Sequence, residues 1–183
     1  MDEQKVSIPN FLSLFRIILV PVMVIFLMDG SFFKALAVFS IAGITDALDG
    51  FLARVLNQRT ILGAYLDPLA DKALLTSCFV TLSILGVIPG WLAVIVVSRD
   101  FIILLGISIL FMVSIPFKIQ PAFVSKVTTA LQLITALLAL VFQCWSIRGA
   151  VLWLHLFYWI TAGFTTISGF HYLLRGMKTI NNA

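Results

Sequence analysis

Four aspartates stand close together in a chain that is otherwise almost continuously apolar. They lie in the segment DALDGFLARVLNQRTILGAYLDPLAD, residues 46–71, at positions Asp46, Asp49, Asp67 and Asp71. An ionised carboxylate at membrane depth is costly and is rarely left without a counter-charge. Four of them in one short segment therefore indicate a functional counter-charge, such as bound metal ions.

The spacing of these aspartates predicts that they point into one volume. Asp46 and Asp49 are three residues apart and Asp67 and Asp71 are four apart, so each pair lies on one face of a helix. A short polar connection at 57–59 would make the two helices antiparallel neighbours. The two pairs of carboxylates can then converge on a shared site.

Carboxylate oxygens alone are the donor set that hard cations such as Mg²⁺ prefer, with substrate phosphate filling the remaining positions. Two such ions about 3.5–4 Å apart can hold both the attacking and the leaving oxygen of a phosphoryl displacement. The small residues Gly50, Ala53 and Gly63 would let a nucleotide diphosphate approach the helix backbone, and Arg54 would offer charge to its phosphates.

Composition places this site in a membrane protein. Hydrophobic residues make up 61% of the chain and charged residues 11%, with a mean hydropathy of +1.12. Soluble domains carry about 25% charged residues. The net charge of +4 is spread along helix ends instead of being clustered in an arm, which favours anionic lipid head groups over nucleic acid as its partner.

Six hydrophobic segments are each close to the ~20 residues that a helix needs to cross a bilayer. The sequence therefore predicts an all-α integral membrane protein, a single domain over residues 1–183, with transmembrane helices at roughly 11–29, 32–52, 64–88, 91–115, 124–145 and 150–174.

Basic residues concentrate at the ends of segments that would share one side of the membrane. This distribution predicts that both termini and the aspartate site face the cytoplasm. The first ten residues are polar, and the apolar run that follows is too long for a signal-peptide core, so we expect no cleavable signal. With the compact chain, this leads us to expect a bacterial inner membrane.

The 46–71 segment resembles the signature of the CDP-alcohol phosphotransferase family, D-x2-D-G-x2-A-R-x8-G-x3-D-x3-D, with a match at every one of its eight fixed positions. The resemblance implies a six-helix membrane enzyme, commonly a homodimer, that uses two divalent ions, Mg²⁺ or Mn²⁺. It implies that Asp46, Asp49, Asp67 and Asp71 hold the metals, that Gly50, Ala53, Arg54 and Gly63 bind the CDP moiety, and that Asp71 is also the general base.

Flanking segments resemble the branch of the family that makes phosphatidylglycerophosphate and cardiolipin. Phosphatidylglycerophosphate synthases tend to carry extra cations where this chain has Ile107 and Thr128. The resemblance therefore implies transfer of a phosphatidyl group from CDP-diacylglycerol to phosphatidylglycerol, giving cardiolipin and CMP. Glycerol 3-phosphate, a dianion that should demand several convergent cations, is the alternative acceptor.

Arg99 and Lys126 are the candidates for binding the acceptor phosphate, with Arg16 as a third. Each could instead extend from a helix end to the head-group region. Asp100 is expected only to neutralise the neighbouring Arg99.

Two other functions use intramembrane acids. Intramembrane prenyltransferases pair aspartate-rich motifs with Mg²⁺ diphosphates, but they are longer and space their acids differently. A carboxylate-based ion or proton carrier is the non-enzymatic alternative. Against it, the acids cluster at one side of the membrane, and no inverted repeat is evident.

Overall fold

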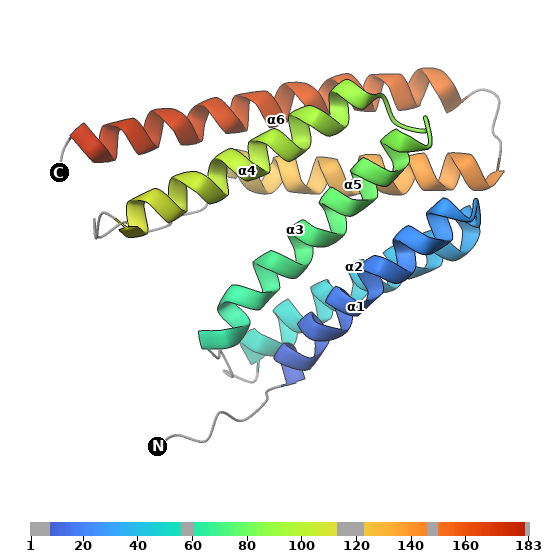
Figure 1. Ribbon diagram of the computed structural model, residues 1–183, viewed down its shortest axis with the longest axis horizontal. Coiled ribbons are helices and arrows are strands. Elements are labelled where there is room, and N and C mark those ends of the chain that lie inside the picture. Colours follow the sequence, from blue (N-terminus) through green and yellow to red (C-terminus); the bar gives the residue numbers. More distant parts are fainter. Residues whose placement is uncertain (1–7, 56–60, 113–122, 146–149, 182–183) are drawn as a thin grey trace.

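The computed structural model describes residues 8–55, 61–112, 123–145 and 150–181, and all of its regular structure there is helical (Figure 1). Side-chain environments are described within 12–46, 69–106, 124–145 and 152–174. The helices are α1 (Ile8–Met28), α2 (Phe32–Val55), α3 (Ile61–Ile84), α4 (Gly90–Met112), α5 (Phe123–Trp145) and α6 (Ala150–Asn181).

These helices confirm the predicted all-α architecture and the order of its six segments. The largest difference is α6, which continues to Asn181, seven residues beyond the predicted end at 174. The prediction followed apolar character, whereas a helix can continue into the polar head-group region with its backbone hydrogen bonds intact. By length and composition alone, Val124–Trp145 is the one described helix apolar enough to cross a membrane, and Leu12–Met28 is a shorter apolar helix.

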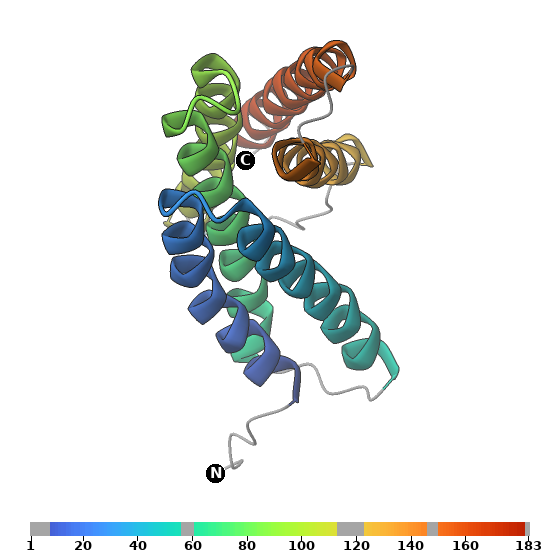
Figure 2. The same ribbon diagram turned by 90° about the vertical axis from the view of Figure 1, so that its right-hand side faces the viewer.

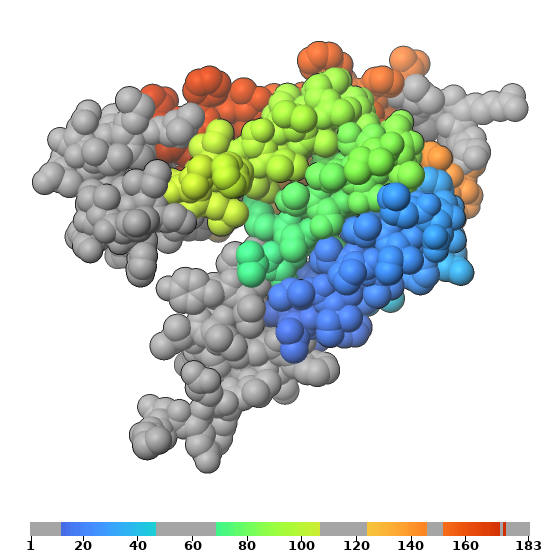
Figure 3. Space-filling view, in the orientation of Figure 1, coloured from blue at the N-terminus to red at the C-terminus, as the bar shows by residue number. Residues whose placement is uncertain are grey.

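The outward surface of the bundle is apolar on all six helices. Large hydrophobic side chains such as Ile25, Phe33, Ile84, Phe101 and Leu152 are exposed. A soluble monomer rarely shows apolar surface of this extent, whereas lipid tails solvate it without cost. In Figure 3, α1, α3 and α4 together form much of one such face.

Two groups of helices make up the bundle. α1 packs against both α2 and α3, while α6 packs against α4 and α5; α3 joins α4, and α2 joins α5 (Figures 1 and 2). Buried side chains from all six helices form one apolar core, which includes Met23, Phe39, Phe79, Leu92, Leu140 and Tyr158.

We expected α2 and α3 to be direct neighbours. Within the described part of the chain, each makes its extensive contacts with α1 instead. Arg16 on α1 contacts one aspartate on each of the two helices, so α1 links them.

The two tight turns of the described chain end their helices in the same way. At the end of α1, the Gly30 amide donates to Leu27 (3.0 Å) and the Ser31 amide donates to Phe26 (2.8 Å), with Gly30 at φ 70°. This Schellman arrangement satisfies two carbonyls that the helix end leaves unpaired, and it requires a left-handed residue. Gly86 has φ 71° and ends α3 with the corresponding bonds.

The Gly30→Ala substitution should lower the free energy of unfolding by about 1–2 kcal/mol, because a Cβ disfavours the left-handed conformation. Nothing lies within 4 Å of the added methyl group, so backbone strain is the whole effect. Gly43→Ala is the matched control, because that position is helical and equally open. Unfolding in detergent micelles measures both, and equal stability of the two variants would contradict the turn argument.

Candidate functional site

Arg16 on α1 joins the first and last aspartates of the signature. Its Nη2 lies 3.2 Å from Asp46 Oδ1 on α2, and its Nη1 donates to Asp71 Oδ1 on α3. The arginine side chain is 0% exposed, whereas the Asp46 and Asp71 side chains are 43% and 38% exposed. The guanidinium therefore lies on the inner side of two carboxylates that remain accessible from outside.

This contact supports the predicted convergence of the acids. Asp46 and Asp71 belong to different helices, yet one guanidinium reaches both of them. The helical backbone continues through Asp49 after Asp46 and through Asp67 before Asp71, so each partner acid is about one turn away. An array of four carboxylates on two such helices has the donor chemistry of a site for hard divalent cations.

The other predicted positions lie where the structure describes only the backbone. Asp49, Gly50, Ala53 and Arg54 are in α2, and Gly63 and Asp67 are in α3, but their side chains are outside the described set. Among the residues with described side chains, which include two of the four aspartates, no group of three potential metal ligands occurs. The assignments of the metal and CDP residues remain predictions.

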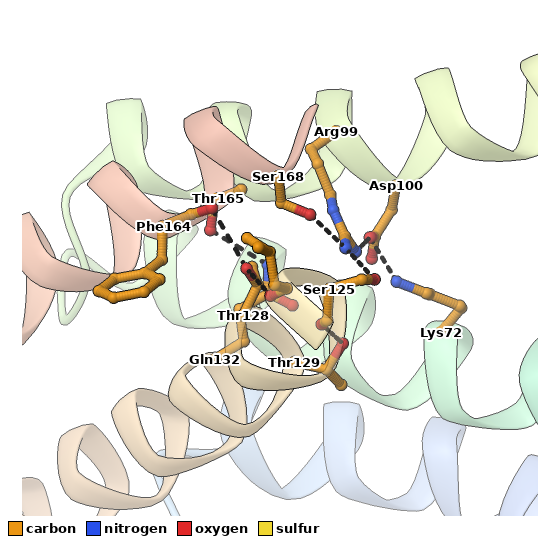
Figure 4. A network of polar contacts seen from close by, with 11 residues as sticks. Lys72, Arg99, Asp100, Ser125, Thr128, Thr129, Gln132, Phe164, Thr165 and Ser168 are labelled. Atoms are coloured by element: carbon orange, nitrogen blue, oxygen red, sulfur yellow. Dashed lines mark hydrogen bonds and ion pairs between the residues drawn. The ribbon is translucent and has the colours of Figure 1, made fainter. Parts of the chain in front are cut away.

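A second charged cluster begins at the residue after Asp71 (Figure 4). Lys72 on α3 and Arg99 on α4 both donate to Oδ1 of Asp100, the arginine at 2.7 Å. Arg99 Nη2 also donates to Ser125 Oγ on α5 (2.6 Å) and to Ser168 Oγ on α6 (2.9 Å). Four helices thus meet at one buried ion-pair cluster, which adjoins the aspartate site through α3.

The expected pairing of Asp100 with Arg99 is confirmed. The acceptor role of Arg99 stays a prediction, and the structure shows its guanidinium engaged with three partners and only 4% exposed. Lys126 is exposed on α5, and Arg16 faces the signature aspartates. These three candidates therefore have different environments.

Sequence reasoning missed Lys72, and the signal for it was present. It is a charged residue within an apolar helix, directly after a signature aspartate, and such residues generally have a partner. Ser125 and Ser168 gave no comparable signal, because a lone serine in a membrane helix is commonly a packing residue.

Hydrogen bonds also join α5 to α6, the two helices that carry Ser125 and Ser168. Gln132 Nε2 donates to Thr165 Oγ1 (3.3 Å), and the Thr135 and Thr161 hydroxyls lie 2.7 Å apart. Thr128 Oγ1 shares its proton between the Val124 carbonyl of its own helix (2.8 Å) and the Phe164 carbonyl on α6 (3.2 Å). Polar side chains of this kind fix neighbouring membrane helices relative to each other. They thereby hold Ser125 and Ser168 together, where both accept from Nη2 of Arg99.

Comparison with known proteins identifies the class. The sequence model of the CDP-alcohol phosphatidyltransferase family matches residues 6–163, and the chain belongs to this membrane-embedded family. The resemblance drawn from the signature is thereby confirmed.

Two kinds of relative lie within that family. The chain is 35% identical to the human cardiolipin synthase (CMP-forming) over 194 aligned positions, covering 97% of this chain and 64% of the human protein. It is 43% identical to the CDP-diacylglycerol--glycerol-3-phosphate 3-phosphatidyltransferase of Haemophilus influenzae over 105 positions, covering 54% of this chain and 56% of that protein. A probable phosphatidylglycerophosphate synthase of Mycobacterium tuberculosis is 37% identical over 122 positions, 63% of this chain and 56% of that protein. The chain thus spans less than two thirds of the length of these relatives.

Proposed function

We propose that this protein transfers a phosphatidyl group from CDP-diacylglycerol to phosphatidylglycerol, forming cardiolipin and releasing CMP. The observation that carries the proposal is the convergence of Asp46 and Asp71 on one side of the bundle, in a chain of the CDP-alcohol phosphatidyltransferase family. The similarity to the human cardiolipin synthase, which covers nearly the whole chain, favours phosphatidylglycerol as the acceptor.

The four signature aspartates would hold two divalent ions, Mg²⁺ or Mn²⁺. Such ions, when bound, neutralise the charge that develops on the phosphate and on the departing CMP. Gly50, Ala53, Arg54 and Gly63 would bind the CDP moiety, as the family signature implies.

Asp71 would take the proton from the attacking hydroxyl of the acceptor. Its side chain is 38% exposed, so a hydroxyl can reach it, while Arg16 fixes one of its carboxylate oxygens from the inner side. A positioned base of this kind contributes about 10²–10⁴ to a rate. The new bond forms between the acceptor oxygen and the phosphatidyl phosphorus, and the bond from that phosphorus to CMP breaks.

The charge of the neighbouring cluster supports an acceptor with one negative charge. Lys72 and Arg99 are both paired with Asp100, so the three groups together carry a single positive charge. Phosphatidylglycerol brings one phosphodiester charge, whereas glycerol 3-phosphate brings a dianion that favours several free cations.

Glycerol 3-phosphate is the second candidate acceptor, and the similarity to the Haemophilus influenzae enzyme favours it. If glycerol 3-phosphate is the acceptor, the exposed Lys126 would have to supply further positive charge to its phosphate. The chain would then form phosphatidylglycerophosphate.

CMP release by the purified protein distinguishes these functions. CDP-diacylglycerol and Mg²⁺ are supplied in detergent with either phosphatidylglycerol or glycerol 3-phosphate, and we expect CMP only with phosphatidylglycerol. CMP only with glycerol 3-phosphate would establish the second candidate. A prenyltransferase would release no CMP in this assay and would release pyrophosphate when a prenyl diphosphate replaces CDP-diacylglycerol. The absence of product from any of these substrates would favour the hypothesis of an ion or proton carrier.

Assembly and membrane are also part of the proposal. The family resemblance supports a homodimer, whose mass in a detergent micelle can be measured by light scattering. The aspartate site would face the cytoplasm, as the distribution of basic residues predicts. The assignment to a bacterial inner membrane is supported by sequence features alone, because the relatives come from both animals and bacteria.

A further inference from the structure

We propose that Arg16 couples divalent-metal binding to binding of the CDP diphosphate. Its fixed charge lowers the metal affinity of the free protein, and the negative charge of the diphosphate restores that affinity. This inference rests on the metal-dependent transfer proposed above. Arg16 is thus a positioning residue that acts through Asp46 and Asp71.

Arg16 is buried against the inner side of the site. Its side chain is 0% exposed, and its two terminal nitrogens contact carboxylates on two different helices. Arginine stays protonated in proteins, and a buried charge is screened little by salt. Metal ions approaching the exposed side of Asp46 and Asp71 therefore always encounter this positive charge behind the carboxylates.

The charges of the site explain why the diphosphate matters. Four signature aspartates would balance two divalent ions, and Arg16 adds one positive charge in direct contact with two of these aspartates. The CDP diphosphate adds two negative charges close to the same ions. Metal and diphosphate should therefore each tighten the binding of the other, since such coupling is reciprocal.

Arg16 has two opposing effects on metal affinity, and we expect the repulsion between its charge and the metal ions to be the larger. The guanidinium orients two carboxylates, which aids metal binding, but it also repels the ions. At an effective dielectric constant of about 20, repulsion over a few ångströms is large enough to change an affinity by about tenfold or more. Arg16→Gln removes the charge, whereas Arg16→Lys keeps it and loses the planar fork that spans two carboxylates.

The test is a titration of the full chain in detergent with Mn²⁺, followed by electron paramagnetic resonance, with and without CDP. Binding of Mn²⁺ to CDP alone is measured without protein and subtracted. In the natural protein, CDP should tighten Mn²⁺ binding by about tenfold, within the usual range of coupling between two sites.

The variants separate charge from orientation. Arg16→Gln should bind Mn²⁺ about tenfold more tightly without CDP, and its response to CDP should fall below about threefold. Arg16→Lys should keep the full response to CDP. Lys34→Gln is the control, because it removes one positive charge from an exposed position near the start of α2, outside the signature; it should leave Mn²⁺ binding as in the natural protein.

Two results would overturn the inference: Mn²⁺ affinity in Arg16→Gln that is no tighter than in the natural protein, or a response to CDP that is unchanged. Arg16→Met is the second neutral variant if Arg16→Gln does not fold, and thermal unfolding checks both. A natural protein that binds no Mn²⁺ would instead contradict the proposed metal-dependent function. The two failures are therefore distinguishable.

Discussion

Replacing Asp71 with Asn should reduce CMP release by about 10²–10⁴-fold, because the variant lacks the base that accepts the hydroxyl proton. Asparagine has nearly the same shape, and Arg16 keeps its contact with Asp46 in the variant, so the fold should be preserved. Binding of CDP-diacylglycerol should persist, because three signature aspartates and the CDP-binding positions remain. The two measurements are CMP release under saturating acceptor and equilibrium binding of the CDP-lipid.

Asp29→Asn provides the control for this experiment. It makes the same chemical change at an exposed aspartate outside the signature, and it should leave CMP release unchanged. Loss of both turnover and CDP-lipid binding in Asp71→Asn would show that this aspartate acts chiefly as a metal ligand. Turnover within a few-fold of the natural protein would contradict its assignment as the base.

The sequence predicted the fold because a membrane imposes simple rules on it. A spanning segment must satisfy its backbone hydrogen bonds internally and present apolar side chains outward, so six hydrophobic runs become six helices. Helix ends were less predictable. α6 extends to Asn181, because the residues beyond the hydrocarbon need not be apolar to remain helical.

Spacing was also informative about the aspartates. A separation of three or four residues places two side chains on one helical face whatever surrounds them, so the pairing of acids follows from local geometry. The contacts of Arg16 do not follow from local geometry, because Arg16 lies 55 residues before Asp71 and 30 before Asp46. Only the packing of α1 against both α2 and α3 brings its guanidinium to those carboxylates.

In the cluster around Asp100, too, local contacts were predictable from the sequence and long-range contacts were not. The pairing of Asp100 with Arg99 was predictable from adjacent opposite charges in an apolar segment. Lys72, Ser125 and Ser168 reach the pair from three other helices. Long-range contacts of this kind depend on how the helices are packed and rotated, which hydropathy does not specify.

This cluster makes Asp100→Asn the substitution with the largest expected effect on stability. The Asp100 carboxylate is 5% exposed and accepts from both Lys72 and Arg99, so a neutral side chain would leave two neighbouring cations without their shared counter-charge. Breaking a buried ion pair from one side typically costs about 3–5 kcal/mol. The free energy of unfolding in detergent micelles should fall by that amount.

Ser168→Ala is the control, because it removes one hydrogen bond to Arg99 and leaves the ion pairs intact. Its cost should be about 0.6 kcal/mol, as for other hydrogen bonds between membrane helices. If repulsion between the two cations causes the loss in Asp100→Asn, adding Lys72→Met should recover part of the stability, and the double-mutant cycle should give a non-additive energy. Equal costs for Asp100→Asn and Ser168→Ala would mean that Lys72 and Arg99 find other counter-charges, and that Asp100 does not hold α3 against α4.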